Sequence, residues 1–275
     1  MEFQKVYFLG IGGIGMSALA RYFLHEGKKV AGYDRTPSHL TDELSAEGAA
    51  IHFEDDVRLI PAEFLDPAAT MVVYTPAVPQ EHGEYRYFAD HGFRIEKRSQ
   101  MLGHLAEGKY VMAVAGTHGK TTTTSLTTTL ITAGGLDPTF VIGGKLMQAG
   151  TNARLGTGEY LVAEADESDA SFLNLSPVLS VITNIDQDHM DTYGHDFERL
   201  KQAFTMFIER LPFYGVAVLC YDDENTRSII PQITKRVISY GLSEEAQVRA
   251  VDVEACGLQM KYTVLRPGYA PLPVV

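Results

Sequence analysis

Residues 116–122 read Gly-Thr-His-Gly-Lys-Thr-Thr, a set of residue types that can bind nucleotide phosphates. Backbone N–H groups at the start of a helix hold phosphate oxygens, Lys120 offers a positive charge to the β- and γ-phosphates, and the Thr121 hydroxyl can reach Mg²⁺. The common GxxxxGK[ST] spacing would need glycine where this chain has Val114, so the form here is shorter. The alternative is a turn that binds nothing. We predict an ATP-binding loop made of Gly116, Thr117, His118, Gly119, Lys120, Thr121 and Thr122.

Two polar clusters each follow an apolar segment that is predicted to be a strand. Residues 164–169 read Glu-Ala-Asp-Glu-Ser-Asp, and residues 183–191 read Thr-Asn-Ile-Asp-Gln-Asp-His-Met-Asp. Parallel sheets bind ligands at the carboxyl ends of their strands, and carboxylate oxygens there suit Mg²⁺. His189 lies inside the second cluster, which makes it a candidate metal ligand. The alternatives are a solvated acidic loop and a solvated histidine.

A glycine-rich turn near the N-terminus carries a second phosphate signal. The segment Gly-Ile-Gly-Gly-Ile-Gly at residues 10–15 follows an apolar strand, and Asp34 ends the next one. This is the GxGxxG pattern, which places a diphosphate at a helix N-terminus. The pattern leaves NAD, FAD and other diphosphates open.

The elements that must position these groups form two blocks of alternating strands and helices. The first block is predicted to have strands at 5–9, 29–33, 50–53, 70–74 and 94–96, with helices at 16–26, 39–47 and 84–91. The second has strands at 110–115, 160–164, 178–183 and 215–221, helices ending near 133 and spanning 197–210, and short strands within 248–275. We predict an α/β fold with a Rossmann-like parallel-sheet domain at residues 1–104 and a P-loop α/β domain at residues 105–275.

Composition excludes several classes of protein. The chain has 275 residues, 45% hydrophobic content and a net charge of −12, and no basic stripe that would indicate a nucleic-acid partner. Its two cysteines, Cys220 and Cys256, form no disulfide framework, so a reducing, cytoplasmic location is expected. The apolar run 6–20 resembles a signal peptide but contains four glycines, which favours a strand-turn-helix. No segment is long enough to cross a membrane.

Four segments in this order resemble the Mur ligase family of peptidoglycan synthesis: GIGGIGM, AGTHGKTTT, EADESDASFL and TNIDQDHMDTYG. The resemblance extends over essentially the whole chain and is closest to the branch that joins L-alanine to UDP-N-acetylmuramate. It implies an ATP-dependent ligase that forms an amide bond through an acyl phosphate. The family branch that recycles murein tripeptide is the alternative.

The resemblance also implies roles for individual residues. The first domain would bind the UDP-sugar through Gly10, Gly12, Gly13, Ile14, Gly15, Asp34, Thr36 and Thr75. Lys120 would hold the ATP phosphates, and Thr121, Glu164 and His189 would match the family's Mg²⁺ ligands. The catalytic set is therefore expected to be Lys120, Glu164 and His189.

Two departures from the family pattern limit these expectations. Some members carry a carbamylated lysine where this chain has Phe204, so no carbamate is expected. The family's C-terminal, amino-acid-binding domain is absent from these residues, so we expect a fragment that cannot complete ligation alone. The rival interpretations are a truncated form that only binds ligands and, from the glycine turn with Asp34, an NAD-dependent oxidoreductase.

Overall fold

The structure, a computed structural model, describes residues 3–146, 151–168, 170–188, 190–257 and 259–275. Contacts between residues divide the chain into two compact units. Unit 1 comprises Met1–Lys109 and Thr124–Ala163, and unit 2 comprises Tyr110–Thr123 and Glu164–Val275. The expected domain boundary between residues 104 and 105 falls within helix α4 (Arg98–Ala106) and stays a prediction.

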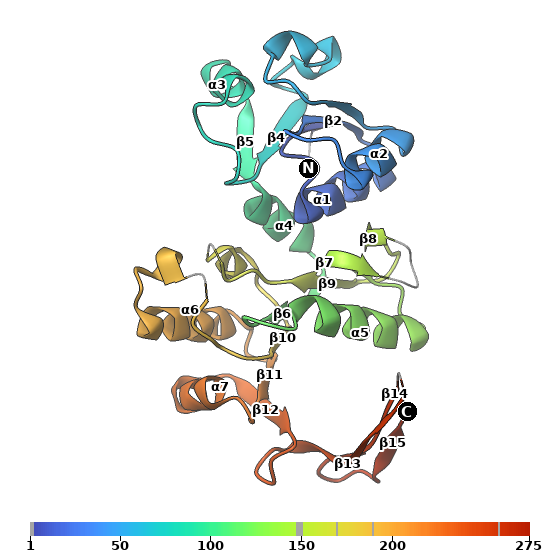
Figure 1. Cartoon of the computed structure of the whole chain (residues 1–275), viewed down its shortest axis with the longest axis vertical. Coiled ribbons are helices and arrows are strands. Elements are labelled where there is room, and N and C mark those ends of the chain that lie inside the picture. Colours follow the sequence, from blue (N-terminus) through green and yellow to red (C-terminus); the bar gives the residue numbers. More distant parts are fainter. Residues whose placement is uncertain (1–2, 147–150, 169, 189, 258) are drawn as a thin grey trace. The chain divides into compact units, whose positions relative to one another are not determined.

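Unit 1 contains a parallel sheet with the strand order β3-β2-β1-β4-β5 (Figure 1). Its strands are β1 (Lys5–Leu9), β2 (Lys29–Tyr33), β3 (Ala50–His52), β4 (Thr70–Tyr74) and β5 (Arg94–Lys97). Strands β2 and β3 lie on one side of β1, whereas β4 and β5 lie on its other side. Open parallel sheets bind ligands at the position where the strand order changes sides in this way, here between β1 and β4. The expected Rossmann-like arrangement is confirmed.

The helices of this part of unit 1 are α1 (Ile14–His25), α2 (His39–Ala46), α3 (Gly83–Asp90) and α4, with short 3-10 helices η1 (Val57–Leu59) and η2 (Ala62–Phe64). Residues of α3, η1 and η2 pack with the sheet around an aromatic core. Tyr7 packs against Phe88 with 4.9 Å between ring centroids, and Phe64 lies on another side of the same ring. These rings are almost fully buried, so β1 is fixed at the centre of the sheet.

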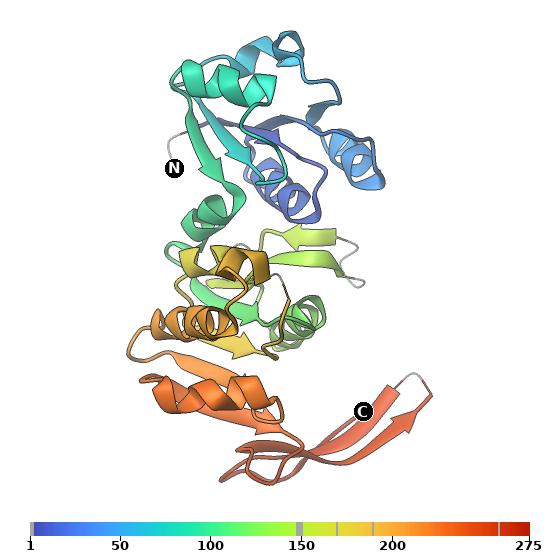
Figure 2. The same cartoon turned by 60° about the vertical axis from the view of Figure 1, so that its left-hand side comes forward.

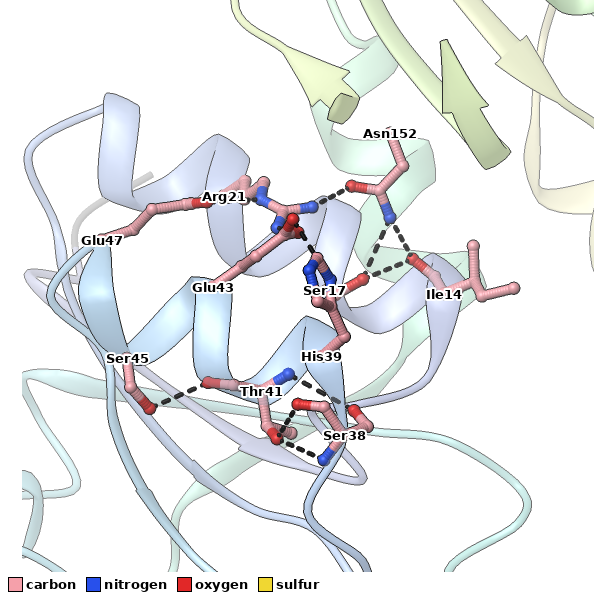
Figure 3. A network of polar contacts seen from close by, with 10 residues as sticks. All are labelled: Ile14, Ser17, Arg21, Ser38, His39, Thr41, Glu43, Ser45, Glu47 and Asn152. Carbon is pink, nitrogen blue, oxygen red and sulfur yellow. Dashed lines mark hydrogen bonds and ion pairs between the residues drawn. The ribbon is translucent and has the colours of Figure 1, made fainter. Parts of the chain in front are cut away.

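Unit 1 also contains strands β7 (Thr139–Leu146), β8 (Thr151–Arg154) and β9 (Tyr160–Glu164, whose last residue belongs to unit 2) and most of helix α5 (Lys120–Ala133). A buried polar network connects β8 to α1 and α2 (Figure 3). The Arg21 guanidinium of α1 bonds to Glu43 of α2 and to Glu47, which caps the end of α2, and donates to Asn152 Oδ1 of β8. The Asn152 amide in turn donates to Ile14 O in the first turn of α1.

The sheet of unit 2 has the order β15-β14-β13-β12-β11-β10-β6. Its strands are β6 (Tyr110–Ala115), β10 (Leu179–Ile182), β11 (Val216–Cys220), β12 (Arg236–Gly241), β13 (Val248–Cys256), β14 (Gln259–Leu265) and β15 (Leu272–Val274). The strands from β6 to β13 pair in parallel, whereas β13, β14 and β15 are antiparallel and form the long ribbon drawn in red in Figure 2. This mixed sheet confirms the α/β class of the second block.

The remaining elements of unit 2 are α6 (Phe197–Glu209), α7 (Glu224–Ile229) and the 3-10 helices η3 (Ser171–Asn174), η4 (Met190–Tyr193) and η5 (Ile230–Gln232). The core under α6 is aromatic: Phe172 stacks on Phe207 at 5.0 Å and contacts Phe204 edge-on at 5.3 Å. Phe204 is therefore a fully buried core residue.

Candidate functional site

The loop that follows β6 is the predicted phosphate-binding loop, and its backbone conformation requires glycine at the first position. Gly116 has φ +134°, and a Cβ atom there would lie 2.1 Å from Thr183 Oγ1 and 3.0 Å from Asn184 O. Gly119, with φ +81°, allows the second turn, and helix α5 begins at Lys120. The predicted strand-loop-helix is thus present, with Thr121 and Thr122 exposed in the first helical turn.

The residues after β10 hold this loop from one side. β6 and β10 are neighbours in register, which brings Thr183 beside Gly116. The Asn184 side chain accepts from His118 N at 2.8 Å and donates to His118 O at 3.0 Å, while Asn184 O accepts from Thr117 N. Asp186 N donates to Thr117 Oγ1 at 2.9 Å. Residues of the polar segment 183–191 therefore fix the conformation of the phosphate loop. The sequence pattern of this segment did not predict that role.

Lys120 makes an ion pair that the sequence did not predict. Its Nζ lies 2.9 Å and 2.8 Å from the two carboxylate oxygens of Glu167, and it donates to Gly116 O at 2.8 Å. Glu167 is 1% exposed. Glu167 was part of the acidic cluster at residues 164–169, so the signal was present, but the pattern did not say which carboxylate faces the lysine.

The segment before α6 fixes the backbone that carries Glu167. The Tyr193 hydroxyl, at the end of η4, donates to Glu167 O, and Thr192 Oγ1 donates to Ser168 O. Loop 116–122 thus contacts two predicted polar segments, the acidic cluster and residues 183–191, and residues 192–193, directly after the latter, contact the acidic cluster. Such convergence at the ends of β6 and β10 is the arrangement expected of a ligand site in a parallel sheet.

The residues predicted to bind Mg²⁺ are only partly described. Thr121 and Glu164 lie in unit 2, at the start of α5 and the end of β9, whereas His189 lies outside the described residues. Across the described part of the chain, no group of three or more His, Cys, Asp or Glu side chains could hold a metal by itself. A hydroxyl and a carboxylate are nevertheless hard oxygen donors, and Mg²⁺ bound with a nucleotide usually needs only one or two protein carboxylates. The donor chemistry therefore fits.

A second candidate site lies in unit 1, in a cavity of about 690 Å³ at the ends of β1, β2 and β4. Six of the eight predicted UDP-sugar residues line it: Gly10, Gly12, Gly13, Asp34, Thr36 and Thr75. Ile14 and Gly15 are not among the lining residues. The sequence missed Tyr33, Arg35, Ser38, His82 and residues 77–79, of which Arg35 and Tyr33 could have been found as neighbours of Asp34.

The glycine turn in this cavity is already bonded to a carboxylate. Asp34 Oδ2 accepts a 2.6 Å hydrogen bond from Gly12 N, and a Cβ at Gly12 would lie 2.8 Å from the same oxygen. Gly10 has φ +88° and contacts Thr75 across the ends of β1 and β4. Glycine at both positions therefore allows the close approach of β1, β2 and β4 at this edge.

A buried titratable cluster lies next to Tyr33, which lines the cavity and contacts the rings of His52 and His82. Tyr7 Oη donates to Glu84 Oε2 at 2.7 Å and lies 2.7 Å from His52 Nε2. Burial raises the pKa of the Glu84 carboxyl to about 7, although the Tyr7 hydrogen bond opposes the shift. Burial also lowers the pKa of His52 and of His82, and His82 is in contact with Tyr33, at 4.4 Å between ring centroids.

Two consecutive segments of the chain each match a domain model of the same protein family. Residues 5–110 match the "Mur ligase family, catalytic domain", and residues 114–268 match the "Mur ligase middle domain". The UDP-N-acetylmuramate–L-alanine ligase of Burkholderia ambifaria is 55% identical over 272 residues, which cover 99% of this chain and 57% of that protein. The enzyme of the same name from Paraburkholderia xenovorans is 53% identical over 275 residues. The chain thus spans 57% of the length of these curated relatives.

Solved structures agree with this fold. A UDP-N-acetylmuramate-alanine ligase from Thermotoga maritima superposes with a TM-score of 0.84 at 28% identity, covering 98% of this chain and 60% of that one. The UDP-N-acetylmuramate:L-alanyl-gamma-D-glutamyl-meso-diaminopimelate ligase of Neisseria has a TM-score of 0.86 at 24% identity, covering 97% of this chain and 85% of that one.

No helix in the described ranges is long and apolar enough to cross a membrane.

Proposed function

This chain belongs to the Mur ligase family, and we propose that its protein joins L-alanine to UDP-N-acetylmuramate with hydrolysis of ATP to ADP and phosphate. The proposal rests on the geometry of loop 116–122. There Lys120 Nζ is hydrogen-bonded to Gly116 O and Glu167, and the loop lies beside the polar residues that follow β10, the neighbour of β6. The names of the relatives at 53–55% identity support L-alanine over murein tripeptide as the second substrate.

The proposed reaction must bring together two anions, the lactyl carboxylate and the ATP triphosphate. Each pair of unit negative charges 4 Å apart contributes a repulsion of about 4 kcal/mol at an effective dielectric constant near 20. Lys120 would offset this repulsion on the phosphates, and loop N–H groups would orient them for transfer to the carboxylate. Mg²⁺, when bound by Thr121, Glu164 and His189, would neutralise charge on the transferring oxygens. The amine of L-alanine would then displace phosphate from the acyl phosphate.

The cavity of unit 1 is proposed to bind the UDP part of the sugar nucleotide. The N-terminus of α1 has no acidic residue in its first turn, so it can accept a diphosphate next to Gly12 and Gly13. On this view residues 1–104 are the sugar-nucleotide domain and residues 105–275 belong to the ATP-binding domain. A cytoplasmic location follows from the nucleotide substrates.

Ligand-dependent unfolding of the chain tests both sites. A ligand at 100 times its dissociation constant adds about 2.7 kcal/mol to the free energy of unfolding, so UDP-N-acetylmuramate and ATP should each raise the melting temperature. Stabilisation by NADH instead of UDP-N-acetylmuramate would favour the oxidoreductase. An active ligase that carries this chain should release phosphate from ATP when UDP-N-acetylmuramate and L-alanine are both present. Release that requires murein tripeptide instead would favour the recycling ligase, and ligand binding without any release would favour the binding-only form.

A further inference from the structure

We propose that Glu167 is an internal competitor of phosphate: its carboxylate occupies the position on Lys120 that an ATP phosphate must take. The inference rests on the proposed phosphate-binding role of loop 116–122. Glu167 would then be a positioning residue that acts through Lys120 and tunes how tightly the loop binds anions.

The ammonium group of Lys120 already has acceptors for its hydrogens in the chain without phosphate. An ammonium group has three hydrogens, and within the described ranges at least four oxygens lie within reach of Nζ: both Glu167 oxygens at 2.9 and 2.8 Å, Gly116 O at 2.8 Å and Thr117 O at 3.3 Å. A phosphate oxygen cannot approach Nζ without displacing one of these acceptors. The carboxylate is the acceptor that carries the same charge as phosphate, so it is the one in competition.

Glu167 cannot simply move into water when phosphate arrives. Its residue is 1% exposed, and its backbone carbonyl accepts from the Tyr193 hydroxyl, whose residue is also buried. A carboxylate that loses its cation at such a position is costly, because desolvation is no longer offset by the ion pair. Two effects therefore make the free energy of phosphate binding less favourable. One is the loss of the Lys120–Glu167 contact, and the other is the repulsion between phosphate and the carboxylate.

The charge of Glu167, rather than its shape, should set this opposition. The variant Glu167→Gln keeps the size of the side chain and one oxygen that can accept from Lys120, but it removes the negative charge. The variant Glu167→Asp keeps the charge on a shorter side chain. If the competition is real, the two variants change anion affinity differently, whereas a merely structural role for Glu167 would weaken binding in both.

Equilibrium binding of inorganic tripolyphosphate in the presence of EDTA measures this without metal and without turnover. We expect Glu167→Gln to bind tripolyphosphate about tenfold tighter than the unaltered chain, the effect of removing one close unfavourable charge. Glu167→Asp should bind no tighter than the unaltered chain. The matched control is Glu198→Gln, which changes an exposed carboxylate that pairs with Lys201 on α6, outside the loop, and should leave the affinity unchanged.

Equal or weaker binding by a folded Glu167→Gln chain would overturn the proposal. If that variant does not fold, a structure of the unaltered chain with tripolyphosphate decides: Lys120 Nζ must have left at least one Glu167 oxygen, and an intact two-oxygen contact overturns the inference. Failure of the unaltered, folded chain to bind tripolyphosphate or ATP at all is a different result, because it removes the proposed phosphate site itself.

Discussion

Gly116 should tolerate no side chain. Alanine there would combine a left-handed backbone conformation with a Cβ atom 2.1 Å from Thr183 Oγ1 and close to backbone atoms of Asn184. Conformational strain and overpacking together predict a loss of about 2–5 kcal/mol in the free energy of unfolding, with loss of ATP binding. Chemical denaturation measures the first and calorimetric titration the second.

Gly108 provides the control for Gly116. It also has a positive φ, +76°, but a Cβ atom added there would meet no other atom within 4 Å. Gly108→Ala should therefore show only the conformational cost, about 1–2 kcal/mol, and should retain ATP binding. Equal losses in the two variants would mean that contact with Thr183 is unimportant.

Glu84 should make stability depend on pH. Its folded-state pKa of about 7 lies above the ordinary value of 4.5, because the carboxyl is buried. Between these two values the folded chain retains a proton that the unfolded chain has released. The contribution of Glu84 to stability is therefore greatest below pH 4.5 and falls as the pH rises to about 7, by at most about 3 kcal/mol.

The difference in unfolding free energy between the unaltered chain and Glu84→Gln isolates this effect. The amide keeps a bond with Tyr7 but does not titrate, so the difference should fall between about pH 5 and pH 7 and level off at higher pH. Glu81→Gln, an exposed carboxyl on the same segment, is the control and should give a nearly constant difference. A flat profile for Glu84→Gln would contradict the raised pKa.

Sequence patterns identified the phosphate loop but not the partner of its lysine. Lys120, Thr121 and the glycines belong to a local motif. Such a motif can be recognised in the sequence because it consists of residues that are close together in the chain. The contact between Lys120 and Glu167 joins residues that are far apart in the chain. Three carboxylates within four residues could each have faced the lysine, and only tertiary packing, including the Tyr193 hydroxyl, selects Glu167.

At the scale of elements, regular apolar segments were predicted best. The bounds of β1, β2, β4, β6 and β9 agree with the expected ranges, because each is a compact apolar run next to a turn. Elements without that signal were missed, among them α4, α7, β7, β8 and β12. β7 contains the adjacent glycines 143 and 144, and the sequence of β8, Thr-Asn-Ala-Arg, is mostly polar although Asn152 is 2% exposed. Tertiary hydrogen bonds, not hydrophobic periodicity, bury that strand.

The Asn152 contacts should hold the first turn of α1 against β8. Asn152 donates to Ile14 O and Ser17 Oγ and accepts from Arg21 (Figure 3). Asn152→Ala would leave these buried groups without that partner, so we expect a loss of about 1–3 kcal/mol in unfolding free energy. Hydrogen exchange should become faster in the first turn of α1 while exchange in unit 2 is unchanged.

Ser45→Ala is the matched control for the network. The Ser45 hydroxyl donates to Thr41 O one turn earlier in α2, on the exposed side, so its loss should change stability by less than about 0.5 kcal/mol. Unchanged exchange in α1 for Asn152→Ala would show that the helix start is held by other contacts.

At the scale of the whole molecule, each proposed phosphate site contains a carboxylate bonded to a group that would bind phosphate. Asp34 accepts from Gly12 N in unit 1, and Glu167 accepts from Lys120 in unit 2. Buried donors without partners are costly, and the two carboxylates remove that cost in the free chain. Ligand binding at both sites is then an exchange of one anion for another, which lowers affinity but keeps the donors positioned.

The two sites lie in different units, so a change in one should spare binding at the other. The double variant Lys120→Met, Glu167→Gln removes the proposed phosphate cation without leaving a buried, unpaired carboxylate. We expect ATP to lose its stabilising effect on this variant, because the loop keeps its amides but lacks the charge that balances the triphosphate. UDP-N-acetylmuramate should still raise the melting temperature by the same amount as in the unaltered chain.

Hydrogen exchange locates these effects in the chain. In the unaltered chain ATP should slow exchange at residues 116–123, and UDP-N-acetylmuramate should slow exchange within residues 10–13 and 33–38, most of which line the cavity of unit 1. The double variant should lose only the first protection, whereas Lys201→Met, an ion-pair lysine on α6, should keep both. Loss of the sugar-nucleotide protection in the double variant would contradict independent sites. Retained ATP protection would show that Lys120 does not carry the phosphate site, since the amides alone would then suffice.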